Sequence, residues 1–484
     1  MSSISEESTL SDRKRSFFSL ALGLFFIIML GELSGASYVL VATALPKIAA
    51  RYQTTQIAWA FTILSITSAL IIGLVGKLAD MKGKRMVLLC LVTSATIGSI
   101  ISANAPNYAT FLVGRALQGT LYLVPAIGFS LIRDVFPRNL VALGISMVFT
   151  GAGVVYVAGP FVAGWLINNF GLLSVFWFLS IYQVICMVGI VITVPESTIR
   201  VQGKLNWVAS ALVGIGSAIL IYTIGESSEW GWTSTKFVGG VMTGLLCYAL
   251  WIKRDSKHPH PLIEIKQLRT RRMWTTLVVT FVVFSATNAT NSILPGMLQT
   301  PPGIGAGFGF GLNEYGVARF MVPMAITLTA GGILVGAMSR FWGIRVPLII
   351  GLLAVATSTM ALRTLPDAPV TIMSIMAVYG LGVGITTGCL PNLMMQSVPQ
   401  EIQGIAATTQ ATVMVLGAGI PTQLIFMILG QHTIELATGY YFGAVGYRLS
   451  FEVIAAIAAI AVPFVMFVVP HGRRVDVARA TAGV

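Results

Sequence analysis

Residues 76–89 read GKLADMKGKRMVLL, and residues 336–349 read GAMSRFWGIRVPLI. Each segment joins two apolar stretches, and three residues recur at the same positions in both. The matching pairs are Gly76 and Gly336, Gly83 and Gly343, and Arg85 and Arg345. Internal repeats are a common way to build large membrane folds. The recurrence therefore indicates a chain built from two similar halves.

The chain around these segments is unusually apolar. Of its 484 residues, 56% are hydrophobic and only 10% are charged, and its mean hydropathy is +0.85. A soluble globular domain carries about 25% charged residues. The composition therefore excludes an ordinary soluble enzyme and a disordered protein, and it indicates a chain that is solvated mainly by lipid.

A helix crosses a bilayer with about 20 mostly apolar residues, and fourteen stretches of the chain meet this requirement. They lie at 16–45, 56–75, 86–103, 108–132, 139–168, 173–194, 205–225, 235–252, 273–298, 313–338, 345–362, 369–396, 403–430 and 450–470. We therefore predict an all-α membrane protein with fourteen transmembrane helices.

The spans and the repeat together predict two six-helix bundles with two extra helices between them. The predicted parts are a tail at 1–15, an N-terminal six-helix bundle at 16–195, a linker with two extra transmembrane helices at 196–272, a C-terminal six-helix bundle at 273–470 and a tail at 471–484. The first span is too long for the core of a signal peptide, so we expect it to be retained. Little sequence is left for a soluble catalytic domain, and we expect no enzyme activity.

Basic residues in short loops set the orientation of a membrane protein. The net charge is +13, from 30 Lys and Arg against 17 Asp and Glu. Placing both termini in the cytoplasm leaves few basic residues in the outer segments, namely Lys47, Arg51, Lys236, Arg363 and Arg448. We therefore expect a multi-pass protein of the cell membrane with both termini cytoplasmic. The membrane explains the basic charge, so we expect no nucleic-acid partner.

Three motifs lie at the ends or inside of early spans. Residues 76–85 read GKLADMKGKR, residues 112–119 read LVGRALQG, and residues 153–164 read GVVYVAGPFVAG. In this order they resemble the inner-loop signature G-x-L-a-D-r-x-G-r-k, the R-x-x-q-G motif and the antiporter motif g-x-x-x-G-P-x-x-G-G. These belong to the major facilitator superfamily, in particular to its fourteen-span drug:proton antiporter branch. Met81, Val155 and Ala163 depart from the usual residues.

This resemblance implies roles for the motif residues. The first motif would form a conformational gate at the inner surface that stabilises the outward-open state, from Gly76, Asp80, Gly83, Lys84 and Arg85. The third would form a hinge or a barrier to proton leak, from Gly153, Gly159, Pro160 and Gly164. Small residues let helices approach closely, and proline removes one helical hydrogen bond, so mere packing is the alternative for the third motif.

Glu32 and Arg115 are the candidates for proton coupling. The branch usually carries an Asp seven residues before Ala44-Leu45-Pro46, but Ser37 stands there in this chain. Glu32 is the one carboxylate that falls deep in a predicted span, where a charge costs at least about 2.5–3.5 kcal/mol. The resemblance implies that Arg115 lies near the first helix and couples protonation to conformation. The alternatives are a structural, hydrogen-bonded glutamic acid and an arginine satisfied by helix-end carbonyls.

A substrate site is expected at the middle of the membrane between the two halves. Aromatic and methionine side chains there suit bulky and varied apolar ligands. The candidates are Tyr38, Trp59, Tyr122, Tyr156, Phe284, Asn288, Asn291, Met324, Tyr379, Gln410 and Met414. The long outer stretches 300–313 and 431–449 either cap the outer vestibule or form flexible loops.

The sequence thus predicts a proton-coupled antiporter that exports hydrophobic or amphipathic small molecules, such as drugs, by alternating access. Export of a lipid or of an endogenous secondary metabolite on the same fold is the alternative. A membrane enzyme would need clustered His, Asp or Ser at one bilayer face, and a sensor would need an output domain. The cysteines and histidines lack metal-ligand spacing, so we expect no metal and no cofactor. The expected partners are a small substrate, protons and the bilayer, and we expect a monomer.

Overall fold

The computed structural model describes residues 19–197, 200, 206–256, 270–397, 403–436 and 439–468. Fourteen of its helices are long and apolar enough to cross a membrane, from Ser19–Tyr52 to Ala444–Phe467. The predicted all-α membrane fold with fourteen spans is therefore confirmed. The predicted tails at 1–15 and 471–484, and most of the polar end of the linker, lie outside the described residues.

The first six spans run from Ser19 to Thr193. The first span, Ser19–Tyr52, is interrupted by one irregular turn at Glu32, and the fourth span is split by a short 3-10 segment. The elements after the interruption are α2 (Leu33–Tyr52), α3 (Trp59–Lys82), α4 (Lys84–Ala103), α5 (Tyr108–Gln118), η1 (Gly119–Leu123), α6 (Val124–Val135), α7 (Arg138–Phe170) and α8 (Ser174–Thr193).

Two further spans and a one-turn helix follow, and then the last six spans. The middle elements are α9 (Trp207–Gly225), α10 (Ser227–Trp230) and α11 (Thr235–Asp255). The last elements are α13 (Arg271–Gln299), α14 (Glu314–Trp342), α15 (Arg345–Leu362), α16 (Pro369–Ser397), α17 (Gln403–Gly430), β1 (Thr433–Leu436), β2 (Gly439–Phe442) and α18 (Ala444–Val468).

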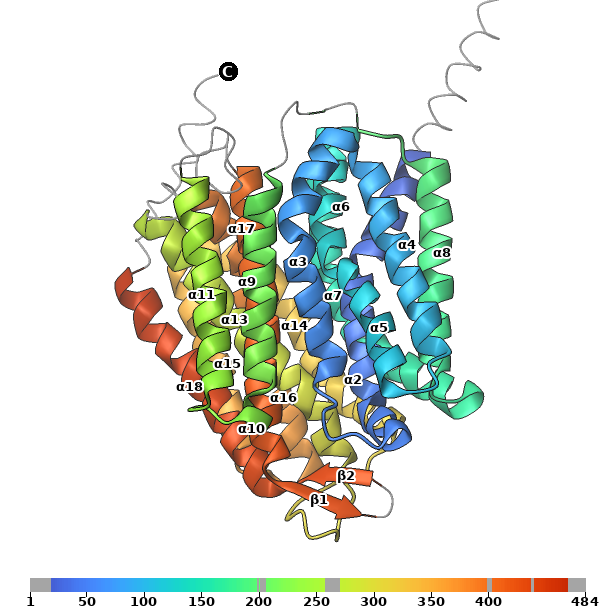
Figure 1. The fold of residues 1–484 in the computed structure, drawn as a ribbon, viewed down its shortest axis with the longest axis vertical. Helices are drawn as coiled ribbons and strands as arrows, with labels where there is room; N and C mark the ends of the chain where they lie inside the picture. Colours follow the sequence, from blue (N-terminus) through green and yellow to red (C-terminus); the bar gives the residue numbers. More distant parts are fainter. Residues whose placement is uncertain are drawn as a thin grey trace, which may run out of the picture.

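The helices run between two faces of the molecule (Figure 1). The first span (deep blue) begins and α8 ends toward the top of this view, and α18 runs from the bottom toward the same side, which we call the terminus face. The antiparallel β1–β2 hairpin, in which Thr433 pairs with Phe442, lies at the opposite side, the hairpin face. No hairpin was predicted in this stretch, and the last span was predicted to begin at 450, whereas α18 begins at Ala444.

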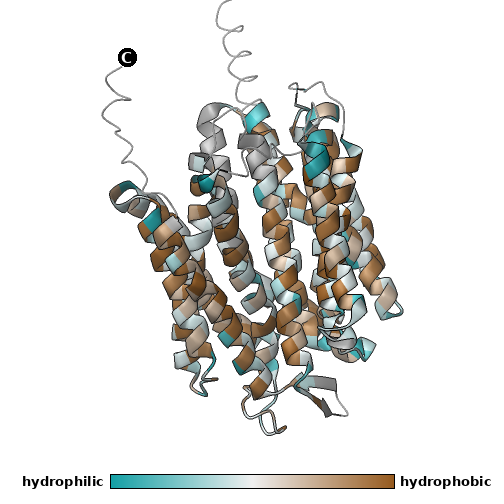
Figure 2. Ribbon diagram, turned by 60° about the vertical axis from the view of Figure 1, so that its left-hand side comes forward, coloured by the Kyte–Doolittle hydropathy of each residue, from teal (hydrophilic) through white to brown (hydrophobic). Residues whose placement is uncertain are grey.

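The outer surface of the helices is apolar along most of their length, with polar residues gathered toward the two faces (Figure 2). Ile192, Val370 and Phe467 expose 76%, 74% and 78% of their surface. Large exposed apolar areas are rare on soluble monomers. Lipid contact accounts for them here, because a helix that crosses a bilayer needs an apolar exterior.

The two halves meet along several helix pairs. α7 packs against α14, α2 against α13, and α3 against α17. The extra helix α9 covers the α3–α17 seam, since it contacts both helices. A Cβ atom at Gly214 of α9 would lie 2.6 Å from the backbone oxygen of Leu70 in α3. Glycine is therefore needed there for the two backbones to approach so closely.

Candidate functional site

Glu32 occupies the irregular turn of the first span. Its backbone nitrogen still donates to Ile28 O, and its own carbonyl accepts from Ala36, so the helix direction continues through the turn. The residue is only 7% exposed, and its Oε1 atom has no hydrogen-bond partner among the described residues. A carboxylate buried without a partner is costly when charged, and a bound proton removes that cost.

The surroundings of Glu32 belong to the N-terminal half. A Cβ atom at Gly151 of α7 would lie 2.7 Å from Glu32 Oε1, so the acid fills space that only a glycine leaves open. Tyr156 of α7 and Tyr182 of α8 lie within electrostatic range of the carboxyl group. Tyr182 donates its hydroxyl to Met29 O at 3.0 Å. Glu32 is thus held between α7 and α8.

Arg115 lies in α5 and is completely buried. Its Nε donates to Ala60 O at 2.9 Å, and its Nη1 donates to Ser37 Oγ at 3.1 Å and to Gln118 Oε1. Gln118 in turn donates to Ser99 Oγ at 2.9 Å. Arg115 therefore contacts the first span through Ser37, at the position where the resembled branch carries an acid.

The two candidates for proton coupling do not form an ion pair with each other. Among the described residues, the ion pairs involve neither Glu32 nor Arg115. The Nη2 atom of Arg115 also lacks a hydrogen-bond partner there. The first span therefore places Glu32 against α7 and Ser37 against Arg115. The carboxyl group of Glu32 and the guanidinium group of Arg115 thus have different neighbours.

A small hollow of about 190 Å³ lies between the halves. Three of the predicted substrate-binding residues, Tyr38, Tyr122 and Asn288, line it. Its other lining residues are Phe61, Thr62, Ser65, Ala418, Gly419 and Thr422. The Tyr38 hydroxyl donates to Asn288 O at 2.8 Å and so links α2 to α13 across the two halves. We refer to this space as the central hollow.

Three further candidates surround the central hollow without lining it. Tyr156 and Tyr379 lie within electrostatic range of Tyr38. Asn291 donates to the Tyr156 hydroxyl at 3.3 Å, which joins α13 to α7. Its Oδ1 atom has no partner among the described residues. The structure thus gathers aromatic hydroxyls and amides of both halves around the central hollow.

The remaining substrate candidates lie elsewhere. Trp59 packs against Tyr222 of α9, with ring centroids 5.6 Å apart, and does not line the central hollow. The other four are buried or half-buried residues of α13, α14 and α17 that also do not line it, namely Phe284, Met324, Gln410 and Met414. For these five residues a substrate role stays a prediction from sequence.

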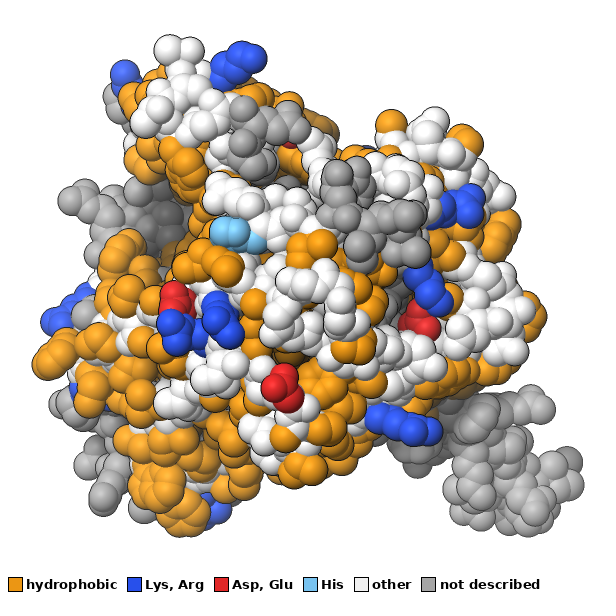
Figure 3. Space-filling model, turned by 90° about the horizontal axis from the view of Figure 1, so that it is seen from below, with side chains coloured by type: hydrophobic (Ala, Val, Ile, Leu, Met, Phe, Trp, Pro, Cys, Tyr) orange, Lys and Arg blue, Asp and Glu red, His pale blue; other side chains and the backbone are white. Residues whose placement is uncertain are grey.

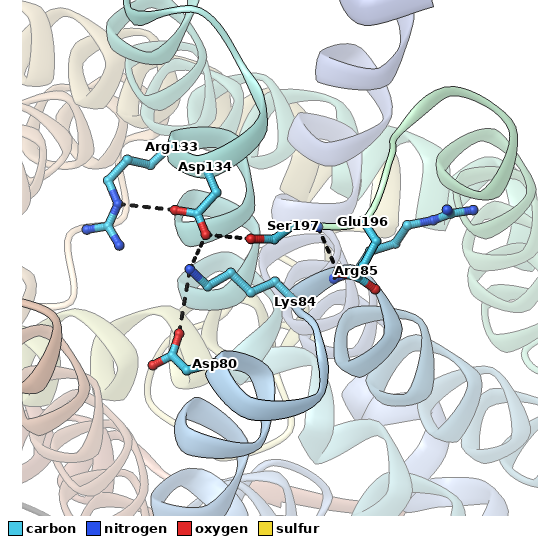
Figure 4. Close-up of polar contacts among 7 residues, drawn as sticks. All are labelled: Asp80, Lys84, Arg85, Arg133, Asp134, Glu196 and Ser197. Atoms are coloured by element: carbon cyan, nitrogen blue, oxygen red, sulfur yellow. Dashed lines mark hydrogen bonds and ion pairs between the residues drawn. The ribbon is translucent and has the colours of Figure 1, made fainter. Parts of the chain in front are cut away.

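The predicted gate residues lie in a cluster of charges at the terminus face (Figure 4). Lys84 forms an ion pair with Asp134 of α6, and its Nζ lies 3.5 Å from Asp80 Oδ1. Both Lys84 and Asp134 have nearly buried side chains, whereas that of Asp80 is 47% exposed. Ser197 Oγ also donates to Asp134, at 2.8 Å. Lys84 and Asp134 therefore form the centre of this terminus-face cluster, and Asp80 lies at its edge.

Glu196, which follows α8, completes the terminus-face cluster. Its two carboxylate oxygens accept from the backbone nitrogens of Arg85 and Met86 at 2.9 and 3.0 Å. These nitrogens belong to the first turn of α4, which has no helical partners for them. Gly83 precedes this turn with φ +121°, and a Cβ atom there would lie 2.7 Å from Glu196 Cδ. The motif glycine is therefore required both by the backbone conformation and by the packed carboxylate.

All residues of the terminus-face cluster lie between the start of α3 and the segment that follows α8. Gly76, the remaining gate candidate, lies half-buried in α3. The cluster thus connects helices of the N-terminal half to one another. Its described hydrogen bonds and ion pairs do not reach α13–α18. Its direct effect is to fix the relative positions of α3, α4, α6 and the end of α8.

The antiporter-motif glycines of α7 lie at contacts with other helices. A Cβ atom at Gly153 would overlap Thr329 Oγ1 of α14, and one at Gly164 would lie 3.0 Å from Glu314 Cβ. At Gly159 it would lie 2.7 Å from a methyl group of Val39 in α2. Pro160 lies inside α7 and is buried. The motif therefore forms much of the surface on which α7 touches the C-terminal half.

Polar contacts join the two halves near the hairpin face. Lys47 of α2 forms an ion pair with Glu314 of α14 at 2.6 Å, and Gln299 of α13 donates to Thr43 O of α2 at 3.0 Å. Gly164 packs on Glu314 from α7. We call these residues the hairpin-face seal. Seen from this side, the surface carries few charged side chains among apolar and uncharged atoms (Figure 3).

The outer stretch 300–313 packs on its own half rather than across the mouth. Gly311 N donates to Thr300 O at 2.9 Å, and Ala444 N donates to Ala306 O at 2.9 Å, which ties the stretch to the start of α18. Phe308 lies against Tyr447, with ring centroids 5.1 Å apart. The hairpin, in contrast, touches α2 through β2.

Sequence reasoning missed several of these residues. Asp134 and Glu196 lie at the ends of predicted spans next to basic loops, and an acid in such a place was a signal for an ion pair. Lys47 was predicted in an outer segment and Glu314 at the start of the tenth span, but pairing them required the arrangement of α2 and α14. Gly151 carried no signal, because glycine is common in membrane helices.

The sequence was compared with known proteins. A family model described as Major Facilitator Superfamily matches residues 20–421. A protein of Streptomyces coelicolor named "Probable actinorhodin transporter" is 28% identical over 398 residues, which are 78% of this chain and 67% of that protein. A Lactococcus lactis protein named "Uridine/deoxyuridine transporter" is 26% identical over 86% of this chain and 88% of its own length. "Multidrug transporter protein MdtP" of Bacillus subtilis is 22% identical over 90% of this chain and 79% of its own length.

Solved structures share the arrangement of helices. The human organic anion transporter MFSD10 superposes with a TM-score of 0.63 at 12% identity, over 92% of this chain and 99% of that one. An auto-inhibited peptide transporter of the POT family superposes with a TM-score of 0.65 at 14% identity, over 94% and 98% of the two chains. At such identities the likeness shows the fold alone.

Proposed function

Because the chain belongs to the Major Facilitator Superfamily, we propose that this multi-pass membrane transporter is a proton-coupled exporter of hydrophobic or amphipathic small molecules. It exchanges its substrate for protons by alternating access, with the two halves rocking about the central hollow. The observation that carries the proposal is Glu32, a buried acid with an unpaired oxygen that packs on the helix of the antiporter motif.

In this proposal, helix α7 couples proton binding at Glu32 to the movement of the two halves. On one side, Gly151 of α7 receives the Glu32 carboxyl group, and on the other, Gly153 and Gly164 receive Thr329 and Glu314 of α14. Binding of a proton at Glu32 removes a buried charge and favours close packing of the first span on α7. Release of the proton restores the charge and favours a state in which water reaches it. A change at Glu32 thereby alters the surface through which the halves touch.

The structure corresponds to a state closed at the hairpin face. The hairpin-face seal joins the halves there, through Lys47 with Glu314 and Thr43 with Gln299. The terminus-face cluster holds helices of the N-terminal half together. In the proposed cycle, this cluster keeps the N-terminal half rigid while the seal opens and closes.

The terminus face is assigned to the cytoplasm of a cell membrane in this proposal. The assignment is supported by the basic residues Lys77, Lys82, Lys84 and Arg85 around the end of α3, since such residues favour the cytoplasmic side. The hairpin face then points outward, and the substrate leaves through the hairpin-face seal when it opens.

Export of an endogenous secondary metabolite is the second candidate for the same site. It is favoured by the relative named for actinorhodin, to which the chain is 28% identical. The two candidate functions share the same transport mechanism and differ in the compound that is exported. Loss of export of a self-made compound on deletion of the gene, with unchanged tolerance to added drugs, would favour the second.

The proposal is tested by replacing Glu32 with glutamine in purified protein reconstituted into proteoliposomes. The amide keeps the size of the protonated acid but cannot release a proton. We expect Glu32→Gln to abolish gradient-driven substrate movement and substrate-induced proton movement, while downhill exchange persists. Glu452→Gln is the matched control, because Glu452 is 36% exposed and pairs with Arg363 in the C-terminal half. Normal proton movement in Glu32→Gln would show that Glu32 is structural.

A further inference from the structure

The side chains that line the central hollow are all uncharged. They comprise two tyrosines and one phenylalanine from the N-terminal half, together with hydroxyl, amide and small side chains from both halves. Drug-sized ligands occupy pockets of about 300–1,000 Å³, and the hollow is too small in this state to admit one. Entry of a ligand therefore requires the halves to move apart here, and the wall then sets the chemistry of the ligand.

Some of the lining groups are free to hydrogen-bond a ligand. The hydroxyls of Ser65 and Tyr122 form no hydrogen bond with the described residues. Thr62 and Thr422 donate to the carbonyls of Ala58 and Ala418, so their oxygens remain available as acceptors. The rings of Tyr38 and Phe61 lie 4.7 Å apart and form an aromatic wall.

A buried positive charge, Arg115, lies next to this wall. Arg115 donates to Ser37 and Ala60, which are the chain neighbours of the lining residues Tyr38 and Phe61. It also lies within electrostatic range of the lining residue Tyr122. No carboxylate of the described residues lies within ion-pair distance of Arg115. Among the described residues, no negative charge at that distance therefore cancels the electric field of Arg115 at the hollow. The low dielectric constant of the interior also screens this field only weakly.

The acid of the proposed proton site is not part of this wall. Glu32 packs on Gly151 and does not line the central hollow. A lipophilic cation in the hollow would thus meet the field of Arg115 and no carboxylate. An anion would lose its hydration and meet no cation among the lining side chains, since Arg115 is fully buried behind the wall, with Nε bonded to Ala60, Nη1 bonded to Ser37 and only Nη2 unbonded among the described residues.

We propose that the transported compound is an uncharged aromatic molecule bearing hydroxyl or carbonyl groups, and that the central hollow discriminates against lipophilic cations. Its rings lie against Tyr38 and Phe61, and its polar groups bond to Ser65, Tyr122 and Asn288. This inference rests on the proposed function in taking the hollow as the substrate site.

The first test compares three tricyclic probes with different charges on wild-type protein in nanodiscs, with empty nanodiscs as the blank. The probes are neutral quinizarin, cationic ethidium and anionic anthraquinone sulfonate. We expect quinizarin to bind at least about tenfold more tightly than either charged probe, which corresponds to about 1.4 kcal/mol. Ethidium or anthraquinone sulfonate binding as tightly as quinizarin would overturn the inference.

The second test introduces a negative charge into the uncharged lining of the central hollow. Asn288→Asp keeps the size of the side chain, and the backbone carbonyl that accepts from Tyr38 is unchanged. At mildly alkaline pH we expect this variant to gain ethidium binding by about tenfold, because opposite charges attract strongly in a poorly hydrated site. Unchanged ethidium binding in a folded Asn288→Asp protein would show that charge does not set the preference.

Asn104→Asp is the matched control. Like Asn288, Asn104 donates its side-chain amide to the carbonyl four residues earlier, but it is exposed at the end of α4. It should not change ethidium binding, and an equal gain there would place the effect outside the hollow.

Proton release is recorded separately during quinizarin binding. A preference for quinizarin without proton release would contradict proton coupling and support the charge preference. Proton release on equally tight binding of ethidium would support coupling and contradict the preference.

Discussion

Lys47 at the end of α2 and Glu314 in the first turn of α14 form an ion pair that joins the two halves, with Nζ 2.6 Å from Oε1. The Glu314 side chain is 3% exposed, whereas that of Lys47 is 46% exposed. Lys47 therefore covers a buried acid against which Gly164 of the antiporter motif packs. Separation of the halves at this face must hydrate Glu314 and uncover that glycine in one movement.

Removal of the Lys47 charge should weaken the hairpin-face seal. Because Lys47 is 46% exposed but its loss uncovers the buried Glu314, we expect Lys47→Gln to cost at least about 1 kcal/mol, or a several-fold shift toward states open at this face. The measurement is the labelling rate of Thr43→Cys by an impermeant maleimide, in protein whose four native cysteines are replaced. Thr43 is buried in the described state, so faster labelling reports opening.

The control for this experiment is the charge swap Lys47→Glu with Glu314→Lys. It restores an ion pair across the same gap and should slow labelling toward the wild-type rate. If Lys47→Gln and wild type label equally fast, the ion pair does not hold the face closed.

The two acids next to Lys84 should differ in importance. Asp134→Asn leaves a buried lysine without its main partner, which typically costs about 3–5 kcal/mol. Asp80→Asn removes a longer contact to a half-exposed side chain, worth about 0–1 kcal/mol. We expect the thermal unfolding midpoint to fall clearly for Asp134→Asn and little for Asp80→Asn, while Asp80→Asn lowers transport at normal expression. Unchanged transport in Asp80→Asn would contradict its predicted gating role.

The contact between α7 and α14 should tolerate no added methyl group at Gly153. Gly153→Ala would overlap Thr329 Oγ1, so we expect transport to fall about tenfold or more if the helices must part by a few tenths of an ångström. Thr329→Ala removes the overlapping oxygen, and the double variant should regain activity. Gly336→Ala serves as the control, because nothing lies within 4 Å of its added methyl group. Equal activity of Gly153→Ala and Gly336→Ala would contradict a role of close packing there.

The proposed orientation predicts which loops can be labelled from outside intact cells. Pro302→Cys in the stretch after α13 should react with an impermeant maleimide, and Ser256→Cys at the end of α11 should react only after permeabilisation. Both positions are exposed, so access and not burial decides the result. The reverse pattern would invert the assignment of the two faces.

Sequence patterns predicted the spans well because each helix must be apolar along a fixed length. Their ends were harder to predict. The first span was expected to stop at 45, yet α2 continues past Pro46 to Tyr52, since a proline interrupts only the bonds of one turn. The last span was expected to begin at 450, although Tyr447 is buried and already helical.

The candidate site was predicted only where a residue is unusual in a membrane helix. Glu32 and Arg115 stood out as charges, and the structure buries both. Ser37 was noticed only because it stands where the resembled branch carries an acid. Ala60 and Gly151 did not stand out, because they are ordinary residues whose importance depends on which helix faces them. Trp59 stood out as an aromatic residue but packs on the inserted helix α9. Pairing between distant segments is set by tertiary packing, which composition and spacing do not encode.

The position of α9 has a consequence for molecules dissolved in the bilayer. This helix contacts α3 through the close approach at Gly214, and it contacts α17 on the other side of the seam. A lipid-soluble compound that diffuses in the plane of the membrane cannot pass between α3 and α17 to reach the central hollow without displacing α9. The inserted helix α9 thus acts as a lateral barrier along this seam.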